Sequence, residues 1–134
     1  LEVGTGSGYQ AAVLAEMGVR VYTIERQREL YRKAQIMLGE LGYRVHFFLG
    51  DGYEGQPQYG PYDGIIITAA TDEVPGELLK QLRTGGRLVV PKGKRDLQVM
   101  TLYERRGEDD YEITTHGNFI FVPMLRGIAN TNKE

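Results

Sequence analysis

The stretch that decides the fold is LEVGTGSGYQAAVLA, residues 1–15. An apolar strand end, Leu1 to Val3, runs into a turn with glycine at positions 4, 6 and 8, and a short helical pattern follows. Such glycines allow a tight turn and let a ligand approach the backbone, while a helix start offers free N–H groups. A dinucleotide fingerprint would need its third glycine at position 9, which is tyrosine, so the spacing argues against a dinucleotide.

Strand and helix patterns alternate in the residues that follow. The run Ile65 to Ile67 is typical of a strand buried on both faces, as in a parallel sheet covered by helices. Proline near the start of the segment 75–82 is typical of a helix beginning there. We expect helices over residues 8–17, 27–41 and 75–82, strands over 20–25, 44–49, 62–68 and 87–91, a loop over 50–61 and a turn at 84–86.

The pattern changes in the last third of the chain. Residues 97–104 and 111–122 are typical of two strands, and the short polar connection between them favours an antiparallel hairpin. The polar tail, residues 130–134, predicts a frayed end. The fold class is therefore α/β: a Rossmann-like, doubly wound, mostly parallel sheet with a C-terminal antiparallel hairpin, in a single domain over residues 1–134.

Composition excludes several kinds of protein. The net charge of −2 gives no general electrostatic case for nucleic-acid binding, and no apolar run is long enough to span a bilayer. The chain has no cysteine, which fits a cytoplasmic location and excludes thiolate metal sites. We expect no metal, no nucleic-acid partner and no membrane partner. The basic cluster of Arg26, Arg28, Arg32 and Lys33 is typical of the solvated face of a helix.

Three sites at expected strand ends add to the glycine turn. Glu25 ends the second strand, where a carboxylate can accept hydrogen bonds from ribose hydroxyls. Asp51 lies between two glycines after the third strand. The glycines permit close approach of a flat ring, and the Asp51 carboxylate can accept a hydrogen bond from an exocyclic amine. The small residue Ala69 follows the fourth strand and leaves room for a ligand. Taken alone, each is also compatible with a purely structural role.

At this point the sequence resembles the protein-L-isoaspartate O-methyltransferases, which are class I methyltransferases. LEVGTGSGYQAAVLA is similar to the first motif of that family, including the Gly-Tyr-Gln after the loop. Further segments resemble the family in order: YTIER (22–26), GDG (50–52), YDGIIITAA (62–70), TGGRLVVPKG (84–93) and FVPMLRG (121–127).

The resemblance implies a cofactor, S-adenosylmethionine, and a reaction. Such enzymes methylate the α-carboxylate of L-isoaspartyl residues, and also D-aspartyl residues, in damaged proteins, and the ester then cyclises to a succinimide. By resemblance the stretch 122–126 closes over the site on the substrate side. The residues expected at the cofactor are Glu2, Gly4, Thr5, Gly6, Ser7, Gly8, Glu25, Arg26, Asp51, Gly52 and Ala69.

Two departures from the family pattern affect the expectation. The family carries an N-terminal segment with a Ser/Thr that helps to hold the substrate carboxylate, and none of it precedes Leu1, so we assign no catalytic residue and expect weak turnover. Lys92 stands where the family usually has an apolar residue. Two alternatives remain: a class I methyltransferase for another substrate, and a cofactor-binding fragment without activity. The sequence does not give the oligomeric state.

Overall fold

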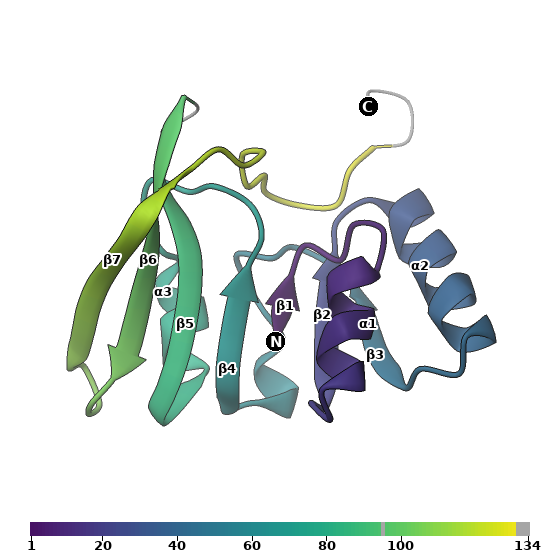
Figure 1. The fold of residues 1–134 in the computed structure, drawn as a ribbon, viewed down its shortest axis with the longest axis horizontal. Coiled ribbons are helices and arrows are strands. Elements are labelled where there is room, and N and C mark those ends of the chain that lie inside the picture. Colours follow the sequence, from purple (N-terminus) through teal and green to yellow (C-terminus); the bar gives the residue numbers. More distant parts are fainter. Residues whose placement is uncertain (95, 131–134) are drawn as a thin grey trace. The chain divides into compact units, whose positions relative to one another are not determined.

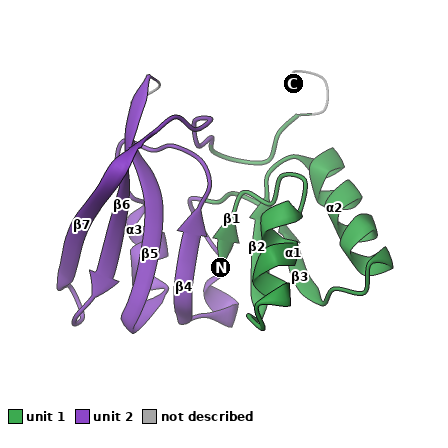
Figure 2. Ribbon diagram, in the orientation of Figure 1, with its two compact units in different colours: residues 1–52, 126–134 green, residues 53–125 purple. Residues whose placement is uncertain are grey.

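A computed structural model describes residues 1–94 and 96–130 (Figure 1). The chain divides into two compact units (Figure 2): unit 1 is Leu1–Gly52 with Arg126–Glu134, and unit 2 is Tyr53–Leu125. Unit 1 contains the glycine-rich stretch, and unit 2 contains the C-terminal hairpin. That residues 1–134 form one domain stays a prediction.

Unit 1 is a parallel α/β sheet with the strand order β3-β2-β1. Its strands are β1 (Glu2–Val3), β2 (Val21–Glu25) and β3 (Val45–Leu49), and its helices are α1 (Tyr9–Glu16) and α2 (Arg28–Glu40). Glu2 pairs with Thr23, and Glu25 pairs with Leu49. The carboxyl ends of the strands therefore lie at one edge of this sheet, which is where α/β proteins bind ligands.

The core of unit 1 lies between this sheet and its two helices. Ala11 from α1, Val21 from β2 and Leu38 from α2 are buried together. Val45 and Phe47 pack against them from β3, so both helices cover the same face of the sheet. This confirms the helices and strands expected from the first half of the sequence, with ends shifted by a few residues.

Unit 2 is a mixed sheet with the order β4-β5-β6-β7. It comprises a 3-10 turn (Pro57–Tyr59), β4 (Tyr62–Ile67), α3 (Gly76–Lys80), β5 (Leu82–Lys94), β6 (Leu97–Arg105) and β7 (Tyr111–Phe119). The strands β4 and β5 run parallel, whereas β5, β6 and β7 are antiparallel neighbours. The expected C-terminal antiparallel hairpin is confirmed.

Three sequence-based boundaries are wrong. The expected turn at 84–86 is an irregularity inside one long strand, because Tyr62 and Gly64 of β4 pair with Leu82 and Arg87 of β5. The last strand ends at Phe119 instead of continuing to residue 122. Residue 82, expected at the end of a helix, begins β5. In each case a strand partner, which the local pattern does not show, decides the boundary. The expectation for residues 131–134 lies outside the described residues.

The burial of β4 differs from the expectation in one residue. Ile65 and Ile67 are buried, while Ile66 between them is half-buried. None of the helices in the described part of the chain is long and apolar enough to cross a membrane.

Candidate functional site

The glycine-rich turn connects the end of β1 to the start of α1. Gly4, Gly6 and Gly8 all have positive φ, at 101°, 55° and 90°. The N–H groups of Gly4 and Thr5 both donate to the carbonyl of Ile24 in β2, at 2.9 and 3.2 Å. The turn is thus bonded to the neighbouring strand, in a conformation that glycine adopts without steric cost.

Gly6 and Gly8 have different packing requirements. A Cβ added at Gly8 would lie 3.3 Å from Leu38 Cδ1 and 3.4 Å from Ala34 Cβ, so this glycine lets α1 start close to α2. A Cβ at Gly6 would meet nothing within 4 Å. The open space beside Gly6 is what a ligand lying against the backbone needs.

Glu25 lies at the carboxyl end of β2 and is bound on both oxygens. Its Oε1 accepts the Gly6 N–H at 2.9 Å, and its Oε2 accepts the Gln27 N–H at 2.9 Å. A carboxylate has about four acceptor positions, so two remain for the hydroxyls of a ligand. The residue expected to bind ribose is therefore rigid, ionisable and bonded to the glycine turn itself.

Glu2 is buried in a hydrogen-bond network of its own. Its carboxylate accepts from the Thr23 hydroxyl at 2.6 Å and from the Gln10 side-chain amide at 3.0 Å. The Thr23 hydroxyl also lies 2.6 Å from the Thr5 hydroxyl. Thr23 has one hydroxyl proton and donates it to Glu2, so Thr5 is the donor to Thr23. Through Thr23, Glu2 therefore determines that the Thr5 hydroxyl in the glycine turn acts as a hydrogen-bond donor.

The burial of Glu2 changes its acidity. Burial raises the pKa of its carboxyl above 4.5, and the hydrogen bonds from Thr23 and Gln10 oppose that rise in part. The negative charge of Glu25 adds to the rise, and the chain's amino terminus lowers it. Because desolvation is the largest of these effects, Glu2 holds its proton more strongly in the folded chain than in water.

The remaining predicted cofactor residues of unit 1 lie next to these groups. Asp51 and Gly52 follow β3 after Gly50, and the Gly50 N–H donates to the Glu25 carbonyl at 3.0 Å. Ser7 is exposed, and its hydroxyl is 3.4 Å from the Tyr9 N–H at the start of α1. Because α1 has no side-chain cap at Gly8, N–H groups of its first turn are available to a ligand carboxylate.

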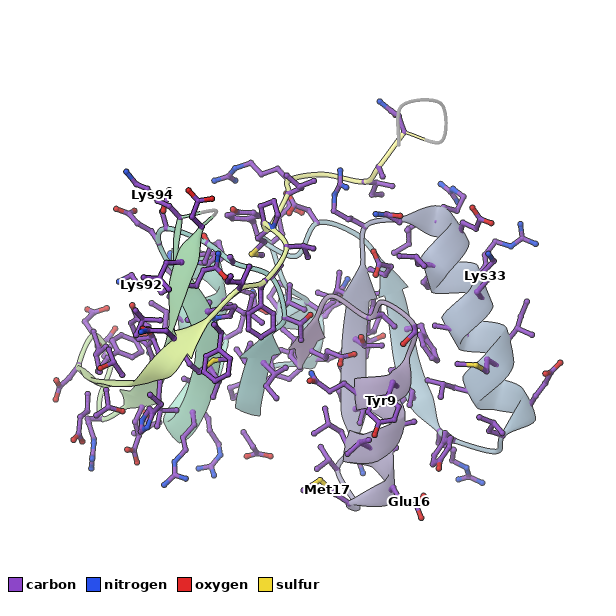
Figure 3. All side chains as sticks on the ribbon, turned by 45° about the horizontal axis from the view of Figure 1, so that its top comes forward. Tyr9, Glu16, Met17, Lys33, Lys92 and Lys94 are labelled. Carbon is purple, nitrogen blue, oxygen red and sulfur yellow. The ribbon has the colours of Figure 1, made fainter. Side chains whose placement is uncertain are left out.

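Arg26 departs from the expected solvated helix face. Arg28, Arg32 and Lys33 are exposed on α2, where Figure 3 shows Lys33 pointing away from the helix. Arg26 precedes that helix, and its guanidinium donates to the carbonyls of Gly127 at 3.1 Å and Arg126 at 3.4 Å. The solvated-face interpretation is therefore wrong for Arg26, because a segment about a hundred residues away approaches it.

In unit 2, the residues after β4 bind the C-terminal motif. Ala69 follows Thr68 there, and the next residue, Ala70, donates its N–H to the Val122 carbonyl and accepts from the Met124 N–H, both at 2.7 Å. These bonds join two of the predicted motifs, which sequence reasoning placed in order but not in contact. A cofactor contact by Ala69 stays a prediction.

Sequence reasoning missed several polar residues that hold the site together. Thr23 and Gln10 hold Glu2 in unit 1, while in unit 2 the buried Gln98 accepts the Phe121 N–H and donates to the Lys94 carbonyl. A polar side chain in the middle of a strand, as at Thr23, is the signal that could have found one of them.

Lys92 and the histidines have local partners. The Lys92 ammonium, on β5 in Figure 3, donates to the Tyr103 hydroxyl at 3.0 Å. His46 stacks on Tyr22 with ring centroids 4.6 Å apart, and His116 bonds the Thr114 hydroxyl. The described residues contain no group of three or more potential metal ligands.

These groups fit the parts of S-adenosylmethionine. Glu25 has acceptor positions left for ribose hydroxyls, Gly6 has open space in front of it, and the uncapped start of α1 suits a carboxylate. No phosphate-binding lysine is needed, since this cofactor carries no phosphate.

Comparison with known proteins gives the family. The family model described as Protein-L-isoaspartate(D-aspartate) O-methyltransferase (PCMT) matches residues 1–129. The chain is 56% identical over 126 residues to the protein-L-isoaspartate O-methyltransferase of Christiangramia forsetii, covering 93% of this chain and 59% of that protein. It is 53% identical over 135 residues to that of Chlorobaculum tepidum, covering 99% of this chain and 63% of that protein. The chain thus spans less than two thirds of the length of these relatives.

Solved structures confirm the Rossmann-like fold. A protein-L-isoaspartate O-methyltransferase structure matches with a TM-score of 0.85 and 32% identity, over 91% of this chain and 40% of that one. A Plasmodium falciparum structure, described as a putative protein-L-isoaspartate O-methyltransferase in complex with S-adenosyl-L-homocysteine, matches with a TM-score of 0.72 and 20% identity, over 92% of this chain and 64% of that one. At that identity it supports the fold alone. Because the family model matches nearly all of its residues, the chain belongs to the protein-L-isoaspartate(D-aspartate) O-methyltransferase family.

Proposed function

We propose that this chain binds S-adenosylmethionine and takes part in methylating the free α-carboxylate of L-isoaspartyl, and also D-aspartyl, residues in damaged proteins. The observation that carries the proposal is the geometry of Glu25. Its two oxygens are held by backbone N–H groups on either side, one of them from the glycine turn, and acceptor positions remain for a ribose. Membership of the family supplies the reaction.

The proposed cofactor contacts follow the edge of unit 1. Glu25 accepts from the ribose, and Asp51 with Gly52 contacts the adenine. The turn from Gly4 to Gly8 lies against the methionine end of the cofactor. Glu2 supports this turn through its hydrogen bond to Thr23, which in turn bonds Thr5. A cofactor contact by Ala69 is proposed from its motif alone.

The proposed reaction requires little acid–base chemistry from the residues of the chain. When bound, S-adenosylmethionine supplies a methyl group on a positively charged sulfur, and transfer of that methyl to a carboxylate oxygen forms an ester without moving a proton. The substrate carboxylate is ionised at neutral pH and is itself the nucleophile. The residues of the chain therefore bind, orient and exclude water, and no general base is required.

The first test measures cofactor affinity. Titration calorimetry with S-adenosylhomocysteine should show binding, and Glu25→Gln should weaken it at least about tenfold, since the amide removes one of two acceptor oxygens. Glu29→Gln is the matched control, because Glu29 is exposed on α2 and pairs with Lys33 at the surface. Absence of binding by the unaltered chain, or equal losses in the two variants, would contradict the proposal.

The second test measures the reaction. Tritiated S-adenosylmethionine is mixed with an isoaspartyl peptide, with the same peptide carrying ordinary aspartate, and with RNA. Label entering only the isoaspartyl peptide supports the proposal. Label entering RNA would favour a methyltransferase for another substrate, and cofactor binding without any transfer would favour a binding fragment.

The proposed partners are proteins and peptides that contain isoaspartyl residues, and the proposed location is the cytoplasm. A chain without cysteine is compatible with that reducing compartment. Fractionation of cells followed by immunodetection checks the location, and recovery in a secreted fraction would contradict it.

A further inference from the structure

The C-terminal segment, residues 121–129, is bound almost entirely through its backbone. Within unit 2, Phe121 N–H donates to the Gln98 side chain, and Val122 carbonyl and Met124 N–H both bond Ala70. The Tyr53 hydroxyl lies 3.5 Å from the Met124 carbonyl. Three separate places in unit 2 thus fix the first half of the segment.

Within unit 1, one residue holds the second half of the segment. The Arg26 Nε donates to the Gly127 carbonyl at 3.1 Å, and its Nη2 lies 3.4 Å from the Arg126 carbonyl. The Arg26 carbonyl accepts the Ala129 N–H at 2.9 Å. Side chain and backbone of Arg26 therefore both bond residues 126–129, and its fixed fork of N–H groups suits two successive carbonyls.

Two apolar side chains of the segment, Val122 and Leu125, are exposed. Val122 is 72% exposed and Leu125 is 49% exposed, although the backbone on both sides of them is bonded. Gly127 has a φ of 71°, a conformation that L side chains rarely adopt, so the bend under Arg26 is built for glycine. A fixed backbone with exposed apolar side chains is suited to contact an extended peptide.

We propose that Arg26 is a positioning residue that fastens residues 126–129, so that the stretch 122–126 is held ready for the peptide substrate. Arg26 is expected from the family resemblance at the cofactor, and the role proposed for its guanidinium is instead to hold the C-terminal segment. The role of holding the segment stands on the hydrogen bonds alone, while the benefit to the peptide rests on the proposed function.

Trypsin tests the fastening without any need for activity. For trypsin to cleave after Arg126, the segment must open locally and break the hydrogen bonds from Arg26 to the carbonyls of Arg126 and Gly127. Arg26→Gln should release the peptide beginning at Gly127 at least about tenfold faster, as measured by mass spectrometry of early time points, because local opening becomes easier. Arg28→Gln, an exposed arginine on α2, should leave that rate unchanged.

Arg26→Lys separates charge from geometry. Lysine keeps the positive charge but lacks the fork, so it should protect the bond less well than arginine. Full protection by lysine, or unchanged cleavage in Arg26→Gln, would overturn the inference. Circular dichroism of each variant shows whether the fold is kept, and a variant that unfolds is replaced by Gly127→Ala, which strains the same bend and should also speed cleavage.

Binding measurements then distinguish the substrate side from the cofactor side. In Arg26→Gln, calorimetry should show S-adenosylhomocysteine affinity within about threefold of the unaltered chain. With that ligand present, the affinity for an isoaspartyl peptide should fall at least about tenfold. Loss of ligand affinity as large as in Glu25→Gln, or unchanged peptide affinity, would overturn the proposed role. If the unaltered chain fails to bind the peptide, the proposed function fails, while the cleavage rates still decide the fastening.

Discussion

Replacing Gly6 by alanine tests whether the glycine turn is a ligand surface or only a bend. Gly6 has a φ of 55°, and a Cβ built on it meets nothing within 4 Å. Gly18, at the end of α1, offers a matched control, because its φ is 86° and its Cβ also meets nothing within 4 Å. The two substitutions carry the same kind of backbone strain and create no clash with the protein.

The size of the stability loss follows from that strain. Holding an L-residue in the left-handed region costs about 1–2 kcal/mol, and alanine recovers about 0.4–1 kcal/mol from the lower entropy of the unfolded chain. A net loss of about 1 kcal/mol is expected for either variant. With an unfolding entropy of about 2.1 cal/mol/K per residue, this lowers the melting temperature by about 3–4 °C.

Affinity for S-adenosylhomocysteine should separate the two variants. A methyl group at Gly6 occupies the space in which the ligand lies against the turn, and such overpacking costs about 1–3 kcal/mol, or about 5- to 150-fold in Kd. Gly18→Ala should bind like the unaltered chain. Calorimetry gives the affinity and scanning calorimetry the melting temperature. Equal affinities in the two variants would refute the assignment of Gly6 to the ligand surface.

The regular elements of unit 1 could be predicted because their signals are local. The helices α1 and α2 and the strands β2 and β3 each have a local apolar pattern and end at a charged residue or beside a glycine, so short-range rules are sufficient. The glycine turn could also be recognised locally, because Gly4, Gly6 and Gly8 lie close together in the sequence. The strand ends that carry Glu25 and Asp51 were located for the same reason.

Other features depend on distant residues, and the sequence pattern could not give them. The long strand β5 passes through the apparent turn at 84–86 because β4 pairs with it on both sides of the irregularity. The local sequence makes Arg26 look like a surface arginine of α2, because it does not show that residues 126–127 bond to its side chain. Glu2 is expected at the cofactor for its charge, whereas its carboxylate bonds Gln10 of the same motif and Thr23, which lies outside that motif.

Two further predictions test the buried network of Glu2. Because burial raises the folded-state pKa of Glu2 above 4.5, the folded chain binds more protons than the unfolded chain between the two pKa values, and this contribution to stability is lost as the pH rises through the folded pKa. Glu2→Gln should remove that loss, so its stability relative to the unaltered chain should increase from pH 4 to pH 8 in urea unfolding; parallel pH profiles would contradict this. Thr23→Val keeps the shape of the side chain and removes the hydroxyl, which leaves Glu2 Oε1 without its donor and Thr5 without its acceptor, both buried. We expect a loss of about 2–6 kcal/mol in urea unfolding, since each of the two unsatisfied buried groups costs about 1–3 kcal/mol. Thr23→Ser should restore most of it, and Thr101→Val, which removes a buried hydroxyl that donates to the Val99 carbonyl, should cost about 1 kcal/mol. If Thr23→Val were no worse than Thr101→Val, the hydroxyl of Thr23 would not couple Glu2 to the glycine turn, and the support proposed for that turn would have to come from its backbone bonds to Ile24 alone.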